Sequence, residues 1–137
     1  MSALSNIYEN ATLNHLTGTA TLTSPTTVYV GLFKSTVDAA TTLANLENNT
    51  QSDEVSGGSY ARVAATFDSA ASGSTSTNAD VTFATATQNW GEVTHISVMD
   101  AATGGSVIVA GQLDTAKTIE SGDTFEITTG NLTVTLA

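Results

Sequence analysis

The stretch WGEVTHISVMDAATGGSVIVAGQL, Trp90 to Leu113, decides the fold. Its two halves, 93–99 and 106–113, are rich in Val, Ile and small residues, and DAATGG at 100–105 separates them. Because Asp and Gly tolerate the positive φ angles of a tight reversal, the pattern predicts a β-hairpin.

Both faces of each predicted strand are apolar. Ile96 and Val98 share one face of the first strand, whereas Val93 and Met99 share the other. A strand with one solvated face alternates apolar and polar residues more regularly. We therefore expect the hairpin at the centre of a sheet, with a second sheet on one side and a helix or another subunit on the other.

Length and composition indicate one domain over residues 1–137, with an N-terminal helix or arm at 1–18 and a β-sandwich at 26–137. The absence of cysteine excludes disulfides and cysteine-based zinc sites. Neither a signal peptide nor an apolar run of about 20 residues is present. We expect the protein to be made and folded in a cytoplasm.

The chain is strongly acidic. Thirteen acidic residues face three basic ones, which gives a formal net charge of −10. Such a surface repels phosphate backbones and anionic membranes, so we expect neither nucleic-acid nor membrane binding. Only 12% of residues are charged, and threonine, which suits strands, is abundant. This composition is typical of a structural or adhesive β domain rather than an enzyme.

Residues 2–16 give the best helical pattern, with Ser2 or Ser5 as N-cap and Gly18 as the stop. Its stripe consists of Leu4, Ile7, Tyr8, Ala11 and His15. The helix either packs on its own domain or docks on a neighbour.

Further strands are expected at 27–33, 60–67, 80–84 and 115–120, and a final hairpin at 124–128 and 132–136. We interpret 69–78 as a low-complexity loop. Residues 34–58 are interpreted as a long loop with at most one helical turn, which is either a binding loop or a surface insertion. Together these elements predict an all-β fold, an antiparallel β-sandwich that is jelly-roll-like, with a short N-terminal helix.

No catalytic, cofactor or metal site is predicted. His15 and His95 lack the spacing of metal ligands, and there is no GxSxG elbow. Paired acids such as Asp53 and Glu54 are typical of solvated turns. Calcium binding by loop carboxylates is left open as an alternative.

Trp90 either caps the core or serves as a hot spot on a partner face. Arg62 either pairs with an acid or forks onto carbonyl groups across a subunit boundary. Candidate subunit or shell contacts are Ile7, Tyr8, Arg62, Trp90 and His95.

The chain also resembles a known family. The segments that carry the resemblance are YVGLF (29–33), EVSGGSYARVAATF (54–67), DVTFATATQNWGEVTHISVMDAATGG (80–105) and SGDTFEITTGNLTVTL (121–136). They resemble small virion proteins of tailed bacteriophages, which are often labelled tail fibre proteins. Similar domains serve as capsid cement or decoration proteins.

The resemblance implies a non-enzymatic virion structural protein without cofactors. The leading interpretation is a capsid cement protein on the outer capsid surface. Such a protein would bind the major capsid protein lattice and associate with itself as a trimer. The alternative is a tail or tail-fibre component with an adhesive or carbohydrate-binding role. Few aromatic residues are available for stacking on sugars, which counts against the carbohydrate-binding form.

Overall fold

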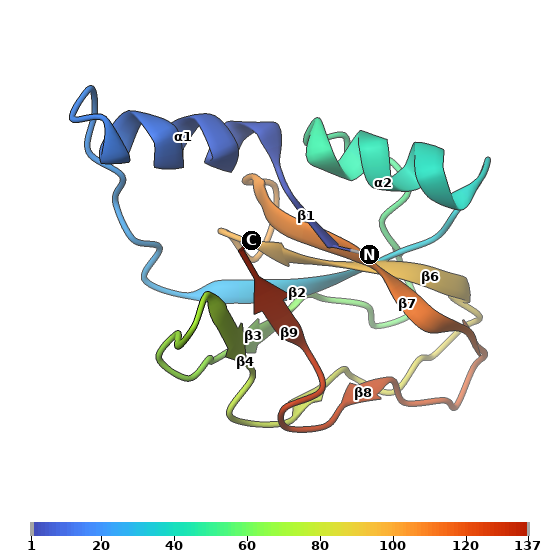
Figure 1. Cartoon of the computed structure of the whole chain (residues 1–137). Coiled ribbons are helices and arrows are strands. Elements are labelled where there is room, and N and C mark those ends of the chain that lie inside the picture. The colour runs from blue at the N-terminus through green and yellow to red at the C-terminus, as the bar shows by residue number, and fades with distance from the viewer. Residues whose placement is uncertain (1, 137) are drawn as a thin grey trace.

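A five-stranded antiparallel sheet forms the middle layer of the protein (Figure 1). The structure is a computed structural model and describes residues 2–136. The strand order is β1-β7-β6-β2-β3. The strands are β1 (Ser2–Leu4), β2 (Val28–Phe33), β3 (Val63–Ala65), β6 (Gly91–Met99) and β7 (Val107–Ile119).

Two helices cover one face of this sheet, and two short strand pairs lie beneath the other (Figure 1). The helices are α1 (Asn6–Leu16) and α2 (Ala39–Glu47). The pairs are β4 (Ser74–Ser76) with β9 (Thr133–Thr135), and β5 (Val81–Thr82) with β8 (Glu126–Ile127). The prediction of an antiparallel β-sandwich with an N-terminal helix is confirmed.

The predicted central hairpin is β6 and β7. Val98 lies opposite Val109, and the backbone N–H of Ser106 donates to Asp100 Oδ1 at 2.7 Å across the turn. Gly105 has φ +65°, the left-handed conformation that favours glycine. The hairpin contacts β1 on one side and β2 on the other, so it is central in the sheet as predicted.

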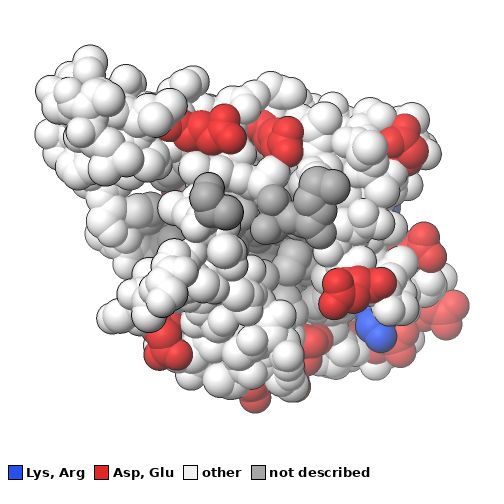
Figure 2. Space-filling view, in the orientation of Figure 1, with Lys and Arg blue, Asp and Glu red and all other residues white. Residues whose placement is uncertain are grey.

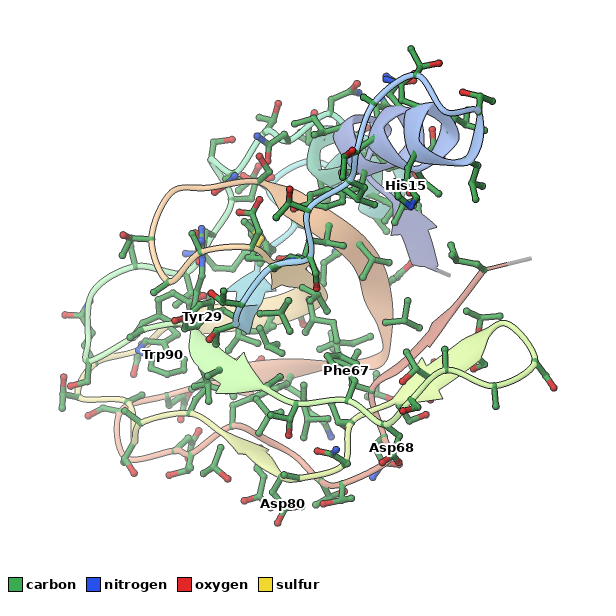
Figure 3. The ribbon with its side chains drawn as sticks, turned by 90° about the vertical axis from the view of Figure 1, so that its left-hand side faces the viewer. His15, Tyr29, Phe67, Asp68, Asp80 and Trp90 are labelled. Carbon is green, nitrogen blue, oxygen red and sulfur yellow. The ribbon has the colours of Figure 1, made fainter. Side chains whose placement is uncertain are left out.

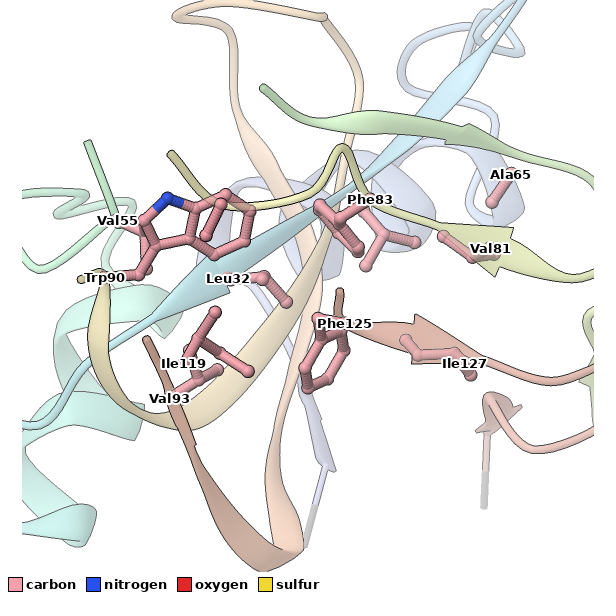
Figure 4. Close-up of a cluster of buried hydrophobic side chains, with 12 residues drawn as sticks. Leu32, Val55, Ala65, Val81, Phe83, Trp90, Val93, Ile119, Phe125 and Ile127 are labelled. Carbon is pink, nitrogen blue, oxygen red and sulfur yellow. The ribbon is translucent and has the colours of Figure 1, made fainter. Parts of the chain in front are cut away.

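The main core lies between the sheet and the short strand pairs (Figure 4). Trp90 is 2% exposed, and its ring meets that of Tyr60 edge-on at 5.5 Å between centroids. Phe83 stacks on Tyr60 at 6.2 Å and meets Phe125 edge-on at 5.7 Å. These aromatic pairs join segments that are far apart in the sequence, which is how so few aromatic residues build one core.

A second core lies between the sheet and α2, where the sequence predicted a loop. Asp38 caps this helix, because its Oδ1 accepts from the Thr41 N–H at 2.8 Å. Leu43 and Leu46 are buried against Phe33 and neighbouring side chains of the sheet. The loop prediction for 34–58 is therefore wrong at 39–47, because burial of one leucine face outweighs the weak helix propensity of threonine-rich sequence.

Three other expectations are corrected. Residues 124–128 and 132–136 do not pair with each other, because β8 pairs with β5 and β9 pairs with β4. The predicted loop 69–78 contains β4. The expected edge strand at 115–120 is the continuation of β7.

The N-terminal helix is shorter than predicted. The helix begins after Ser5, whose Oγ accepts from the Tyr8 N–H at 3.3 Å. The preceding residues form β1 instead, because the edge of β7 offers unpaired backbone groups there. At the other end, Gly18 has φ +73° and closes the helix as predicted.

Candidate interaction surface

Arg62 fixes the tip of the central hairpin from within the chain. Its Nη1 donates to the carbonyl oxygens of Ala101 at 2.9 Å and Gly104 at 2.8 Å. Its Nε donates to Glu54 Oε1 at 2.7 Å. The hydrogen bonds with Glu54 raise the pKa of Arg62 further above its ordinary value. Arg62 therefore pairs with an acid, as one alternative had it. The carbonyl groups that it binds belong to its own chain, and a contact across a subunit boundary stays a prediction.

Glu54 also receives Tyr60, which extends the network to the sheet. The Tyr60 hydroxyl donates to Glu54 Oε1 at 2.8 Å and accepts from the Leu32 N–H at 3.0 Å. Burial raises the pKa of Tyr60 well above its ordinary value, and the Glu54 carboxylate adds to the effect. The hydroxyl therefore stays protonated and links the 48–62 segment to β2.

Tyr8 fixes the beginning of α1 to the same turn. Its hydroxyl donates to Asp100 Oδ2 at 2.9 Å. Burial, together with this hydrogen bond and the charge of Asp100, raises the pKa of Tyr8 to about 12. The first turn of α1 is thereby held, whereas its last turns extend past the end of the sheet (Figure 1).

The overhang of α1 leaves an apolar groove of about 470 Å³ between the helix and the C-terminal strand. All of the lining residues are uncharged. They come from α1, the 22–25 segment, the sheet and β9, and include Leu4, Tyr8, Leu22, Val28, Val134 and Leu136. Figure 3 views this end, with His15 on α1 above and Phe67 on the far side of the groove.

His15 holds one wall of the groove in place. The backbone N–H of Leu22 donates to His15 Nδ1 at 3.2 Å, which ties the 17–27 segment back to α1. The helix also ends in a Schellman-type C-cap, in which the Gly18 N–H donates to His15 O and the Thr19 N–H donates to Asn14 O. The overhanging end is therefore anchored by hydrogen bonds, although α1 has no buried residue in the part of the chain described.

Leu136, on the groove wall, and two leucines of α1 are large apolar side chains that are exposed. Leu13 is 59% exposed, Leu16 is 74% exposed and Leu136 is 59% exposed. Leu16 continues the row of Tyr8 and Thr12 by one helical turn, since residues four apart share a helix face. Large apolar side chains exposed beside an apolar groove are typical of a contact site in soluble proteins.

Charge is distributed away from the groove. In the face seen in Figure 2, acidic residues lie along the upper edge over α1 and α2, on the right-hand side and along the lower edge, whereas the left-hand end of α1 shows none. For a chain with net charge −10, an uncharged surface is where another molecule meets the least repulsion from acidic residues.

The five predicted contact residues lie in two different environments. Ile7 is 46% exposed and Tyr8 is half-buried on the groove wall. Arg62, Trp90 and His95 are held inside the chain; Trp90 Nε1 donates to Gly58 O at 2.9 Å, and His95 is fully buried. For all five residues, contact with another protein stays a prediction. Trp90 caps the core, which is one of the two alternatives that the sequence left open for it.

Sequence reasoning missed the groove and the leucines beside it. The predicted stripe on α1 included Ile7 and His15, whereas the half-buried positions are Tyr8, Ala11 and Thr12. Leu13 and Leu16 were the part of the sequence that could have indicated a second apolar surface on the helix. Both are apolar, they are three residues apart, and they lie outside the predicted stripe. The other groove walls come from segments that only the fold brings together.

Residues 2–136 contain no group of three or more His, Cys, Asp or Glu side chains arranged to hold a metal ion. Within the same residues, no helix combines the length and apolar character needed to cross a membrane.

Comparison with known proteins adds a family. No curated protein matches the chain. The family described as "Podophage GP4 fiber I protein gp80" matches residues 3–135, which include both helices and nearly all of the central sheet and of the groove lining. That description indicates a bacteriophage virion structural protein, as the sequence resemblance implied. The chain therefore belongs to the podophage GP4 fiber I protein gp80 family.

Proposed function

We propose that this protein is a non-enzymatic structural subunit of a bacteriophage fibre, joined to other virion subunits through the apolar groove beside α1. The observation that carries the proposal is the family match over residues 3–135. The uncharged groove supports it, because a fibre subunit needs a durable protein contact and no reactive centre.

The chemistry of the groove sets how such a contact responds to salt. Its lining consists of apolar side chains and a few hydroxyl groups. Contacts of this kind are driven by removal of apolar area from water and are only weakly screened by ions. The contact should therefore persist from low to moderate ionic strength, unlike that of a polybasic binder.

A role as capsid cement is the second candidate. The net charge of −10 favours it, since an acidic protein on the outside of the shell is kept away from the packaged genome. In this role the partners are the major capsid protein lattice and further copies of the chain, as a trimer. Binding only to the assembled lattice would stabilise that lattice by mass action.

The two roles separate in particles that lack the protein. If the gene for this protein is disrupted, we expect particles whose heads have normal heat resistance but which lack a fibre. Addition of the purified protein should restore that fibre. Heads that lose heat resistance and regain it when the protein is added would favour cement instead. Both roles would be contradicted if the disrupted phage made normal fibres and normal heads and if purified wild-type particles contained none of the protein.

A further inference from the structure

We infer that residues 2–27 form a lid that opens as one unit while the body of the protein, residues 28–136, stays folded. The lid consists of β1, α1 and the 17–27 segment that leads into β2 (Figure 1). It is weakly buried, since Ser5 is the only buried residue among residues 3–27. The inference goes beyond the proposed function and applies to a fibre subunit and to a cement protein alike.

The lid is attached to the body mainly through its N-terminal third. Strand β1 pairs with the edge of β7 over three residues. The Ser5 N–H continues this pairing by donating to Ile108 O at 2.8 Å. One helical turn further on, the Tyr8 hydroxyl donates to Asp100 Oδ2 at 2.9 Å. These contacts lie close together in the sequence, so they are expected to break together.

The rest of the lid is tied to α1 rather than to the body. At the first residue of α1, Asn6 Nδ2 donates to Asn48 Oδ1 at 2.7 Å, which adds one more attachment near the N-terminus. In the described part of the chain, the hydrogen bonds formed by residues 17–27 lead back to α1 or stay inside that segment. Loss of the contacts at residues 2–8 would therefore free the whole lid as far as β2.

The apolar groove of about 470 Å³ lies between the lid and the body. Leu4, Tyr8 and Leu22 line it from the lid, and Val98 and Val109 are among the residues that line it from the body. Protein interiors are close-packed, and side chains that border a gap lose the dispersion contacts that a neighbour would supply. The lid therefore packs incompletely on the sheet, which places it among the elements of low local stability.

Opening of the lid has two consequences. An isolated helix of 11 residues is marginal in water, so α1 should unwind when it leaves the body. The edge of β7 at 108–111 would lose its partner, and Val98 and Val109, which are 5% and 8% exposed, would face solvent. An unpaired strand edge is a template for pairing with another chain, so the closed lid protects the middle of the sheet.

Hydrogen exchange of the purified full chain, resolved by residue and limited by the opening equilibrium, tests the inference. We expect the amides of Ser5 and of α1 to share one opening constant, at least about tenfold larger than that of the amides in β6. Low concentrations of urea should speed exchange in β6 steeply and in the lid only weakly, because the urea dependence scales with the surface that an opening exposes.

Two matched substitutions separate lid opening from global unfolding. Tyr8→Phe and Tyr60→Phe each remove a hydroxyl that donates to a carboxylate, Asp100 at the lid and Glu54 inside the body. Tyr8→Phe should speed exchange of the lid amides by about tenfold, since the hydrogen bond to a charged group is lost on opening. Tyr60→Phe should speed exchange in β6 and leave the lid amides unchanged, because the lid opens without breaking the Tyr60 contacts.

Three results would overturn the inference. Lid amides that accelerate as much as those of β6 in Tyr60→Phe would show that the lid is released only by global unfolding. Equal urea dependence of the lid and β6 in the wild type would show the same, and this measurement decides the matter if Tyr60→Phe does not fold. Ser5 and α1 amides that respond to Tyr8→Phe by different factors would show that the lid is not one unit. The fibre role is tested on particles, so it stands or falls separately.

Discussion

Arg62 and Glu54 meet at two points inside the chain: Arg62 Nε lies 2.7 Å from Glu54 Oε1, and Arg62 Nη2 lies 2.8 Å from Glu54 Oε2. The Arg62 side chain is 4% exposed and that of Glu54 is 19% exposed. Since Arg62 also binds the carbonyl groups of the β6–β7 turn, this pair links the 48–62 segment to the centre of the fold.

Removal of Arg62 should therefore be strongly destabilising. Arg62→Met leaves Glu54 and two carbonyl groups without their partner, and breaking a buried pair costs about 3–5 kcal/mol. Chemical denaturation measures this loss in the free energy of unfolding. Lys117→Met is the matched control, because Lys117 is exposed, and its effect should stay within about 0.5 kcal/mol. Equal effects of the two substitutions would contradict the role given to Arg62.

Stability should fall in mild acid because of His95. Burial lowers the pKa of this residue below 6.5, and its ring nitrogens already contact Thr94 Oγ1 and Ala39 O. Below pH 6.5 the unfolded chain binds a proton that the folded chain resists, so the free energy of unfolding decreases as pH falls. Denaturation at pH 7.5 and 5.5 measures the decrease.

A variant isolates this contribution. His95→Gln should show a smaller decrease than the wild type between the two pH values, although it is less stable at both. An undiminished decrease in His95→Gln would assign the pH dependence to other groups.

Val98 tests the position of the central hairpin. It is 5% exposed and lies opposite Val109, so Val98→Asp would bury an unpaired carboxylate and cost several kcal/mol, comparable to the stability of a whole domain. We expect this variant to be unfolded by circular dichroism. Val37→Asp, at a position that is 73% exposed, should fold normally. A folded Val98→Asp protein would show that this strand is misplaced.

The turn of the hairpin offers a closely matched pair of glycines. Gly104 and Gly105 both have positive φ, so alanine at either position is strained by about 1 kcal/mol. A Cβ at Gly105 would also lie 2.7 Å from Ala101 Cβ, whereas one at Gly104 meets nothing within 4 Å. Gly105→Ala should therefore lower the melting temperature further than Gly104→Ala, and the reverse order would contradict the turn geometry.

Local patterns predicted the parts of the fold that local physics decides. The β6–β7 hairpin was predictable because turn residues and two apolar strands are adjacent in the sequence. The final hairpin was wrong for the opposite reason. The turn signal at 128–131 is real, since Asn131 N–H donates to Thr128 O, but β8 and β9 pair with β5 and β4, which are more than 40 residues away along the chain.

The groove shows why the interaction surface could not be predicted from the sequence. Leu4, Leu22 and Val134 belong to three distant segments, and no pattern within any one segment places them side by side. Leu13 and Leu16 carried a signal, yet their exposure depends on where α1 leaves the sheet. The Tyr8–Asp100 hydrogen bond sets that point, and it joins residues 92 positions apart.

Imaging of purified phage particles at side-chain resolution would show where this chain lies in the virion. We expect density for the chain within a fibre, with the groove between α1 and β9 covered by a neighbouring subunit. Density for the chain with the groove facing solvent, or particles with fully traced fibres that lack the chain, would contradict this expectation.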